Sequence, residues 1–357
     1  MNFLSTTIFF LSMVSMCFSC KGHGAERGII GETVSSLDTS IWYIFQDRHN
    51  NYWFGSDGNG VYRYDGKNTL HYTTRHGLCN DRVRGIQEDS SGNIYINTCN
   101  GISKFDGQAF TTLRAITSPG DDGGWRLHSG DLWFQGPQDS GVLYRYDGRT
   151  LYRLRFPKVP VAEEFTATHP RSKFPNMVFS PYDIYSIYMD RRGVLWFGTG
   201  MLGVCRYDGV THFWITEREL GLDSIAYGVR STIEDKYGKF WFSRTLHSFD
   251  IHRNTGGRIS YTEGNGMGDI GSSGSVDHSY FLSSLEDNNG DMWVVTYNKG
   301  IWRYDGKSMI QYRIKDKDGQ YATTFTIYKD RSGGLWLGTH AAGAYKFNGV
   351  SFEPFRP

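Results

Sequence analysis

The stretch Asp190–Gly209, DRRGVLWFGTGMLGVCRYDG, decides the fold because its pattern recurs along most of the chain. Its aspartate can accept a hydrogen bond from the backbone two residues on, and the glycine three residues later can adopt a positive φ, so the pair predicts a tight turn. Val194–Phe197 lacks polar alternation, which is typical of a strand buried on both faces. The next strand of the unit is expected at Val204–Tyr207. A hairpin turn at Asp208–Gly209 follows it, and the fourth strand is expected at THFWIT.

Two short signatures define the repeat. The first is an aspartate followed six residues later by a tryptophan or tyrosine, as in Asp47/Trp53, Asp89/Tyr95, Asp190/Trp196, Asp235/Trp241, Asp287/Trp293 and Asp330/Trp336. A further unit lacks the aspartate but keeps the sequence DLWF around Trp133. The second signature is a basic residue, an aromatic residue, Asp or Asn, and Gly, as in Arg63–Gly66, Lys104–Gly107, Arg145–Gly148, Arg206–Gly209, Arg303–Gly306 and Lys346–Gly349. The fifth unit has HSFDIHRNTGG in its place.

Seven such units, mostly roughly 40 to 45 residues apart, have the period of four-stranded propeller blades. The sequence therefore predicts an all-β fold, a seven-bladed β-propeller of four-stranded antiparallel blades, in one domain at 39–357. The blades are expected at 40–73, 82–113, 124–154, 182–216, 226–262, 280–314 and 322–355. Because the seventh contains all its own strands, the ring closes either by a strand that the N-terminal segment adds to it or by packing between blades alone.

The N-terminal residues predict export. Residues 1–19 are expected to be a signal peptide, because the apolar core Phe3–Phe18 is too short to span a bilayer. The sequence CFSC, ending at Cys20, resembles a bacterial lipoprotein signal in which Cys20 would be lipidated after cleavage; the alternative is an ordinary signal cleaved at the same place. Residues 20–38, rich in Gly, Ser and charge, are expected to be a tether. A periplasmic or outer-membrane lipoprotein of a bacterium is the predicted location.

Composition excludes several classes of protein. The net charge of +1 argues against a nucleic-acid partner or an acidic membrane surface. Beyond the N-terminal segment no run of 18 apolar residues exists, so a lipid anchor is the expected contact with a membrane. The aromatic share of 16% suits blades that pack face to face, and a monomer is expected.

Three inserts between blades exceed a normal connection: Arg114–Gly123, Arg155–Pro181 and Glu263–Ser279. In a propeller, the loops that lead from one blade into the next lie on the same rim as the loops between second and third strands. The three inserts are therefore expected on one face. Long loops on a rigid scaffold usually carry function, which makes this the predicted binding face.

The pattern D-x-x-G-x-[IL]-W-[FIL]-G-T followed by G-[VI]-x-R-Y-D-G resembles the two-component regulator propeller repeat, above all at Asp190–Gly209 and Asp330–Gly349. The resemblance covers about residues 40–355. It implies a propeller of the kind found in periplasmic sensor regions of bacterial hybrid two-component systems, where such propellers bind extracellular breakdown products such as glycans. Those sensors continue into an immunoglobulin-like module, a membrane helix and a kinase, whereas this sequence ends at Pro357. A sensor-like propeller without kinase output of its own is therefore expected.

An enzymatic alternative comes from propellers similar to streptogramin lyases, which share the G-x-[IL]-W strand and use His and Glu on the loop-rich face. A lyase or hydrolase of that type is the second functional hypothesis. The histidines expected near that face are His76, His128, His278 and His340, although an exposed loop histidine has an ordinary explanation. No catalytic residue, metal site or cofactor is predicted, because the sequence has no H-x-x-x-H pattern and no Gly-rich phosphate loop opening a helix.

Three cysteines follow the N-terminal segment. Cys79 lies before the first strand of blade two and Cys99 after its second strand, so antiparallel pairing brings them to the same rim. They could form a disulfide in an oxidising compartment, or remain two ordinary thiols. Cys205 is expected in the core.

The predicted ligand-binding residues are aromatic and basic side chains at the starts of the innermost strands and in the loops between second and third strands. They are Trp42, Arg82, Arg84, Trp125, Arg126, Tyr182, Tyr185, Tyr227, Arg230, Arg244, Tyr280, Tyr297 and His340. Aromatic rings stack on the C–H faces of sugars and Arg pairs with carboxylates, so the set favours a glycan or similar small extracellular ligand. The alternatives are a protein partner on the same face, or packing of these residues between blades.

Overall fold

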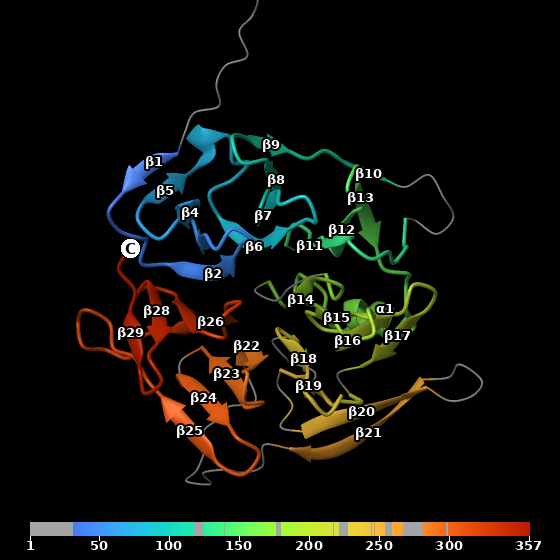
Figure 1. The fold of residues 1–357 in the computed structure, drawn as a ribbon. Helices are drawn as coiled ribbons and strands as arrows, with labels where there is room; N and C mark the ends of the chain where they lie inside the picture. Colours follow the sequence, from blue (N-terminus) through green and yellow to red (C-terminus); the bar gives the residue numbers. More distant parts are fainter. Residues whose placement is uncertain are drawn as a thin grey trace, which may run out of the picture.

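The computed structural model describes residues 31–117, 124–138, 140–175, 180–216, 218–220, 228–243, 245, 247–253, 259–266, 281–297 and 299–357. Seven β-sheets are arranged around one axis, and the chain passes round the ring so that the last blade lies beside the first (Figure 1). The predicted seven-bladed β-propeller of four-stranded antiparallel blades is confirmed, except that blade one has five strands and one strand of blade three pairs in parallel.

The strands follow one another blade by blade. Blade one contains β1 (Glu32–Val34), β2 (Ile41–Gln46), β3 (Tyr52–Ser56), β4 (Val61–Tyr64) and β5 (Thr69–Tyr72), and is followed by the 3-10 turn η1 (Thr74–His76). Blade two contains β6 (Val83–Glu88), β7 (Ile94–Thr98), β8 (Gly101–Phe105) and β9 (Phe110–Thr112). Blade three contains β10 (Ala115–Thr117), β11 (Leu132–Gln135), β12 (Val142–Tyr146) and β13 (Leu151–Arg155).

The helix α1 (Pro160–Thr168) separates the third blade from the remaining four. Blade four contains β14 (Ile184–Met189), β15 (Leu195–Thr199), β16 (Val204–Tyr207) and β17 (His212–Ile215). Blade five contains β18 (Thr232–Glu234), β19 (Phe240–Phe242), β20 (His247–Arg253) and β21 (Ile259–Gly266). Blade six contains β22 (Phe281–Glu286), β23 (Met292–Thr296), β24 (Ile301–Tyr304) and β25 (Met309–Tyr312). Blade seven contains β26 (Thr324–Lys329), β27 (Leu335–Thr339), β28 (Ala344–Phe347) and β29 (Phe352–Pro354).

The repeated aspartate holds both the turn and the tryptophan of its blade. In blade four, Asp190 Oδ1 accepts hydrogen bonds from the backbone N–H groups of Arg192 (2.9 Å) and Val194 (2.8 Å). Asp190 Oδ2 accepts one from the indole N–H of Trp196 at 2.9 Å. The same indole bond occurs at Trp53, Trp241, Trp293 and Trp336, and the hydroxyl of Tyr95 makes it in blade two. The aspartate was predicted for the turn and the tryptophan for the core; the bond between them was not predicted.

Blade three departs from this plan. Its innermost strand is β11, and β10 adds to the outer edge of the blade, parallel to β13. Two backbone carbonyls of β11 accept hydrogen bonds from side-chain amides of blade two: Trp133 O from Gln87 Nε2 at 2.6 Å, and Gln135 O from Asn97 Nδ2 at 3.1 Å. At this edge of blade three, side-chain amides therefore donate hydrogen bonds to the backbone carbonyls of β11. In the other blades, the backbone of a further strand supplies such donors.

The ring closes by packing and hydrogen bonding between blades seven and one. The four strands of blade seven all come from the C-terminal part of the chain, and β1, which lies within the predicted tether, pairs with β5 of blade one. Tyr52 donates its hydroxyl hydrogen to Asp330 Oδ2 at 2.9 Å, and Arg331 N donates to Gln46 Oε1 at 2.9 Å. The ring of Phe355 stacks on Phe54, with centroids 5.5 Å apart. Of the two closures considered from the sequence, the structure has the one without an added strand in blade seven.

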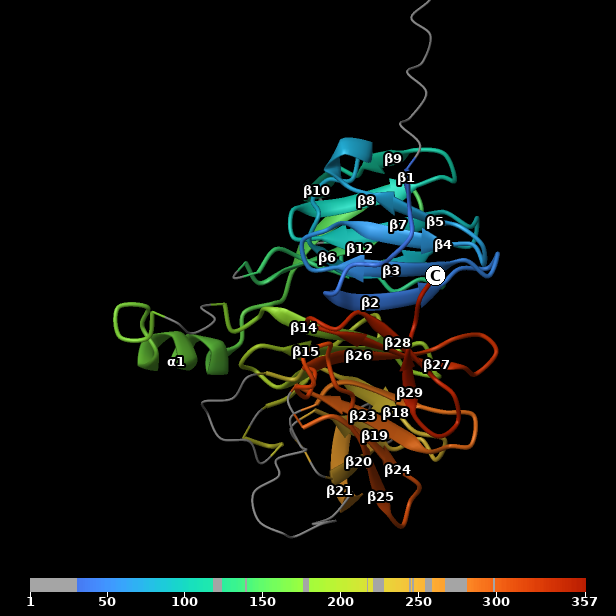
Figure 2. The same ribbon diagram turned by 90° about the vertical axis from the view of Figure 1, so that its left-hand side faces the viewer.

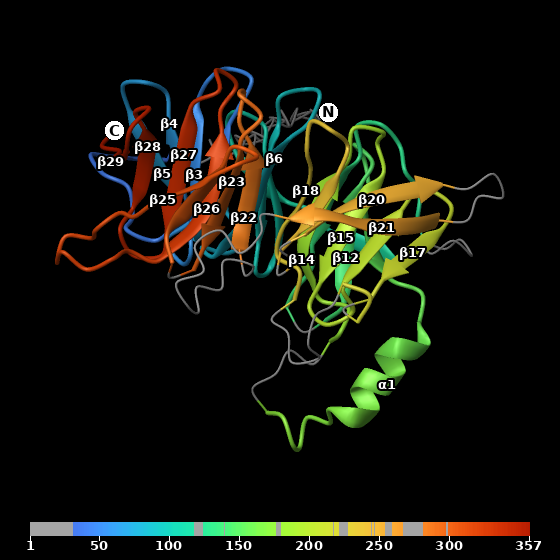
Figure 3. The same cartoon turned by 90° about the horizontal axis from the view of Figure 1, so that it is seen from below.

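The insert Arg155–Pro181 carries α1, which stands away from one face of the disc (Figures 2 and 3). Its base is fixed where the backbone N–H of Val159 donates to the hydroxyl of Tyr182 at 2.9 Å. The other two long inserts lie largely outside the described residues, so the prediction that all three share a face stays a prediction. In the part of the chain that the structure describes, no helix is long and apolar enough to cross a membrane.

Candidate functional site

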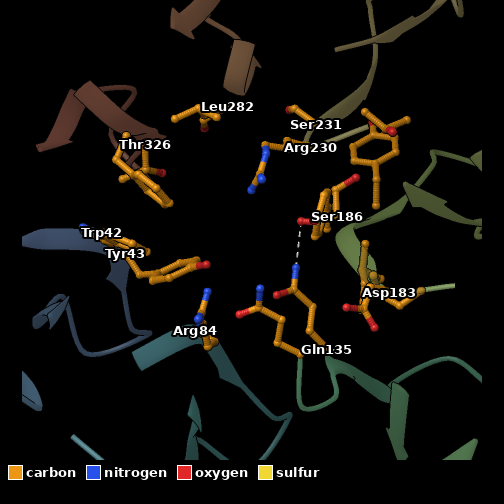
Figure 4. Close-up of a pocket in the computed structure, with 18 of the residues that line it drawn as sticks. Trp42, Tyr43, Arg84, Gln135, Asp183, Ser186, Arg230, Ser231, Leu282 and Thr326 are labelled. Atoms are coloured by element: carbon orange, nitrogen blue, oxygen red, sulfur yellow. Dashed lines mark hydrogen bonds between the residues drawn. The ribbon is translucent and has the colours of Figure 1, made fainter. Parts of the chain in front are cut away.

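A cavity of about 340 Å³ lies on the propeller axis, and all seven blades contribute to its wall (Figure 4). This volume is at the lower end of the range for small-ligand sites. The wall is built mainly from the first residues of the innermost strands, which enter from the face that carries α1. Blade three contributes instead the turn after β11, including Gln135 and Gln138.

One position of the repeat supplies the mouth of the cavity. The residue five positions before the repeated aspartate lines the wall in six blades: Trp42, Arg84, Tyr185, Arg230, Leu282 and Phe325. In five of these blades the strand pairing shifts register at that residue, as a β-bulge does. A bulge leaves its extra residue unpaired and redirects the side chain. The geometry of the repeat therefore points one side chain per blade toward the axis.

The following position supplies a layer of hydroxyl groups. Tyr43, Ser186, Ser231, Ser283 and Thr326 all line the cavity. Several of these hydroxyls also join neighbouring blades: Ser186 Oγ donates to Val229 O at 3.2 Å, and Ser231 Oγ lies 2.8 Å from Ser284 Oγ. The inner wall is thus polar and is held in place by contacts between blades.

Two arginines extend into the cavity from opposite walls and point toward one another (Figure 4). Arg84 Nε donates to Cys99 Sγ at 3.1 Å, and the guanidinium carbon of Arg230 lies 4.2 Å from the ring centroid of Tyr185. Burial lowers the pKa of Arg84, but the hydrogen bond with Cys99 and nearby negative charge outweigh it, so its pKa is raised. Burial also raises the pKa of Tyr43, against the opposing charges of both arginines. Both arginines therefore act on the same region of the cavity.

One carboxylate lines the described wall, and its hydrogen bonds hold a turn. Asp183 Oδ1 accepts from the backbone N–H groups of Ser140 at 3.0 Å and Gly141 at 2.9 Å. These bonds fix the turn after β11 against the start of blade four. Neither His nor Glu occurs among the described residues that line the cavity.

Four of the predicted ligand-binding residues line this cavity: Trp42, Arg84, Tyr185 and Arg230. Trp42 stacks on Phe325 with centroids 4.0 Å apart, and His340 meets the edge of Trp42 at 5.5 Å, with Tyr297 beyond it. His340 and Tyr297 are therefore neighbours of the wall but do not line it.

Four others do not line this cavity: Arg82, Trp125, Arg126 and Tyr182. Arg82 pairs with Asp57 at 3.0 Å, and Arg126 lines a separate depression between blades two and three. Trp125 is buried between blades three and four, where its indole N–H donates to Arg155 O at 2.9 Å, and Tyr182 packs in the same cluster. Arg82 and Tyr182 are seven and eight positions before their aspartate, ahead of the bulge, so their side chains do not reach the axis. Tyr227, Arg244 and Tyr280, like Cys20, lie outside the described residues.

Sequence reasoning missed Tyr43, Leu282, Phe325 and the serines of the hydroxyl layer. They were missed because residues were chosen by side-chain chemistry and not by their place in the repeat. The sequence feature that identifies them is their constant distance from the repeated aspartate. That distance selects Leu282 and Phe325 as well as Arg84.

The two cysteines of blade two are free in the structure. Cys79 Sγ lies 3.2 Å from Thr98 Oγ1, whereas Cys99 Sγ accepts the hydrogen bond from Arg84 and lines the cavity. Thr98 and Cys99 are consecutive residues at the end of a strand and so point to opposite sides. Of the two states considered from the sequence, the structure has the separate thiols. Cys205 is buried in the core, and this burial raises the pKa of its thiol.

The comparisons with known proteins agree with this architecture. A model described as "Two component regulator propeller" matches residues 179–201. No curated protein sequence matches the chain. Among solved structures, the extracellular domain of BT4673 from B. thetaiotaomicron, described as a one component system, is 23% identical with a TM-score of 0.55; the match covers 88% of this chain and 40% of that one.

Two further structures have the same fold. The extracellular domain of BT3049 from B. thetaiotaomicron, described as a hybrid two component system, is 17% identical with a TM-score of 0.54, over 90% of this chain and 41% of that one. A streptogramin B lyase is 15% identical with a TM-score of 0.58, over 90% of this chain and 98% of the lyase. The chain thus spans about two fifths of the length of the two sensor domains. At these identities the likeness is one of fold, and the chain carries a repeat of the two component regulator propeller family.

Proposed function

We propose that the protein is an exported, sensor-like propeller that binds an extracellular ligand, a glycan or a similar small molecule, in the axial cavity. The observation that carries the proposal is the shared position five residues before the repeated aspartate, which directs a side chain of six different blades to one cavity. A feature needed only for folding would not require Arg at that position in two blades and aromatic residues in three.

The chemistry of the wall supports a sugar-like ligand. Aromatic faces from Trp42 and Tyr185 suit the C–H faces of a ring, while the hydroxyl layer and two arginines offer hydrogen bonds to its polar edge. The likeness in fold to extracellular domains of bacterial sensors points to the same class of role.

The alternative, a lyase or hydrolase, is supported by the likeness in fold to a streptogramin B lyase. Such chemistry needs a general acid or base within hydrogen-bond reach of the reacting atoms. The described wall of the cavity contains arginines, aromatic residues, hydroxyls and one carboxylate, Asp183, which accepts two backbone hydrogen bonds, with neither His nor Glu. This composition favours binding over catalysis.

The test is a thermal-shift and calorimetric screen of the purified protein against neutral and acidic oligosaccharides, with each ligand recovered and analysed for product. We expect a shift with ligand recovered intact, and loss of binding in Tyr185→Ala and Trp42→Ala. Arg82→Gln is the control, because Arg82 is exposed and does not line the cavity. Consumed ligand would support the enzymatic alternative, and no response to any oligosaccharide would contradict a glycan ligand and favour a protein partner.

Export and lipidation at Cys20 belong to the same proposal. They are supported by the apolar segment Phe3–Phe18 and the sequence CFSC that ends at Cys20. Expression in a bacterial host with labelled palmitate should place the label on the wild-type protein and not on Cys20→Ser. Label on both proteins, or retention of both in the cytoplasm, would contradict it.

A further inference from the structure

The axial cavity extends further along blade four than along the other blades. Six consecutive residues of blade four line it, Asp183–Tyr188, and they include most of β14. Blades one, two, five, six and seven each contribute two or three residues. Because a strand rises about 3.3 Å per residue, the stretch from Tyr185 at the mouth to Tyr188 spans roughly 10 Å. The cavity therefore reaches along β14 into the interior of the disc.

One position of the repeat marks this deep part of the cavity, the position three residues before the repeated aspartate. Ile187 of blade four and Thr232 of blade five occupy that position and line the cavity. In the other blades with the aspartate, the residues at this position do not line it; they are Ile44, Ile86, Ser284 and Ile327. We therefore define the deep part by Ile187 and Thr232.

The deep part lies beside the irregular blade. Blade three has β11 as its innermost strand, at the position of a second strand in the regular blades. Ile187 packs toward this blade, in the apolar cluster that contains Trp133. The side chain of Gln135 reaches β14 from β11, where its Nε2 donates to Tyr185 O at 2.8 Å. The missing first strand of blade three thus leaves the space along β14 that deepens the cavity on this side.

Ion pairs cross the ring at the face opposite α1. Arg331 of blade seven lies 3.4 Å from Glu88 of blade two, past blade one, and Arg191 of blade four lies 3.3 Å from Glu286 of blade six, past blade five. Both glutamates end innermost strands, so these pairs lie near the axis. None of the four residues lines the cavity. The cavity therefore ends inside the disc, and a chain that enters it cannot pass through.

The deep part contains a polar group that a ligand could satisfy. The side chain of Thr232 is buried, with 6% of the residue exposed, and its Oγ1 has no hydrogen-bond partner among the described residues. A buried hydroxyl without a partner is costly, and such a group in a native structure needs an explanation. A hydroxyl group of a bound ligand beside Thr232 would supply the missing hydrogen bond.

The mouth offers a different surface on the other side of the axis. Trp42 and Phe325 are stacked with centroids 4.0 Å apart and an angle of 20° between their planes (Figure 4). Rings with C–H groups on one face, such as pyranoses, pack well on such a surface. A ligand that contacts both this pair and the deep part must extend from the mouth into the disc.

We propose that the ligand is an unbranched oligosaccharide that binds by its end. Its terminal unit lies in the deep part beside Ile187 and Thr232, and the next unit packs on Trp42 and Phe325 at the mouth. This inference rests on the proposed function and specifies the class of ligand that the same cavity selects. An internal segment of a polysaccharide has no end to insert, and a closed cavity does not let it thread through.

The experiment compares free and blocked chain ends on the purified protein. Linear oligomers of glucose, xylose, arabinose, galactose and mannose, from dimers to hexamers, are titrated calorimetrically. Each oligomer that binds is tested again with its reducing end coupled to a carrier protein, with its non-reducing end blocked by a benzylidene acetal, and with both ends blocked. We expect one singly blocked form to bind like the free oligomer, and the doubly blocked form to bind at least roughly tenfold more weakly.

Two variants test the deep part. Thr232→Val keeps the shape of the side chain but removes its hydroxyl, and should weaken binding about fivefold. The stability of the empty protein should be unchanged or higher, because this hydroxyl has no partner there. Ile187→Phe fills the space beside β14 and should also weaken binding. Its matched control is Ile86→Phe, since Ile86 is half-buried at the same position of blade two and does not line the cavity.

The outcomes separate this inference from the function on which it rests. If doubly blocked oligomers bind as tightly as free ones, binding by the end is overturned and the sugar-binding function stands. The same conclusion follows if Thr232→Val and Ile187→Phe both leave the affinity unchanged. If no oligomer binds at millimolar concentration, the inference and the proposed function are both overturned. Should Ile187→Phe fold poorly, the blocked oligomers still decide the question on the unaltered protein.

Discussion

Blade four and blade three each bury a tryptophan at the same point of the repeat, but they hold it in different ways. Trp196 of blade four donates its indole N–H to Asp190. Trp133 of blade three has no such aspartate, and its indole N–H is buried without a hydrogen-bond partner. The aspartate is therefore more than a turn former, since it also satisfies the polar group that burial of a tryptophan creates.

Blade three compensates with a different aspartate. Asp131, two residues before Trp133, pairs with Arg145 at 2.6 Å, and both side chains are almost fully buried. In blade four the corresponding Arg206 lies over the ring of Trp196 at 6.0 Å from its centroid. Blade six has the same pair between Asp291 and Arg303, but there the arginine side chain is 29% exposed. Arg206 also forms a buried ion pair, with Asp208 at 3.1 Å. Blade three therefore differs from blade four in lacking the indole bond and in pairing its arginine with Asp131, the aspartate next to the buried strand.

The largest effect is expected from Asp131→Ala. It leaves the buried guanidinium of Arg145 without its counter-charge, which costs about 3 to 5 kcal/mol of unfolding free energy. Asp291→Ala removes the same type of partner from a more exposed arginine and should cost about 1 kcal/mol or less. Urea unfolding of the two variants measures the difference, and equal losses would mean that burial of the pair in blade three is not what stabilises it.

A smaller effect is expected when the indole N–H is removed. Trp196→Phe deletes a hydrogen bond to a buried carboxylate, so we expect a loss of about 1.5 to 3 kcal/mol beyond the change in side-chain volume. Trp133→Phe removes a donor that has no partner, and should lose at least 1 kcal/mol less than the other variant. The ranking is read from unfolding in denaturant, and a greater loss in the Trp133 variant would break the comparison.

The pH dependence of the free energy of unfolding should reflect the repeated aspartate, which blade three lacks. Burial raises the pKa of Asp330, but its hydrogen bonds from Ser332, Trp336, Tyr52 and the backbone outweigh this, and the pKa is about 2. A depressed folded-state pKa contributes stability above the ordinary pKa near 4 that is lost as the pH falls toward 2. The contribution is about 2 kcal/mol. Asp330→Asn should therefore lose less stability than the wild type between pH 5 and pH 2. Parallel pH profiles for the two proteins would contradict this.

The sequence predicted the ring of blades because turn, strand and tryptophan signals repeat with a fixed spacing, and each has a local physical cause. It could not predict how blade three is stabilised without its aspartate. The amides of Gln87 and Asn97 act across a blade boundary, and β10 pairs with β13, a strand more than thirty residues further along the chain. Contacts of that kind depend on the relative placement of blades, which spacing along the chain does not report.

Only part of the candidate site could be predicted from the sequence, for a similar reason. Choosing aromatic and basic residues near the strand starts found Trp42, Arg84, Tyr185 and Arg230, which line the cavity, and also Arg82 and Tyr182, which do not. The bulge that decides between them is a feature of strand pairing. The position of the bulge can be recognised in the sequence only by its constant distance from the repeated aspartate.

The smallest effect is expected at the amides that take the place of a strand in blade three. Gln87→Ala leaves the carbonyl of Trp133 without the donor that it now has at 2.6 Å, and we expect a loss of about 1 kcal/mol. Water can reach part of this site, because Gln87 is only partly buried, and that access limits the loss. The matched control is Gln311→Ala, whose amide donates at 2.7 Å to Lys299 O within a regular blade. Hydrogen exchange of the amides of β11 and β12 distinguishes the two, since only Gln87→Ala should speed exchange in blade three. If exchange there is unchanged, the side-chain amides do not stabilise this edge, and blade three is held instead by its ion pair and its apolar contacts with blade four.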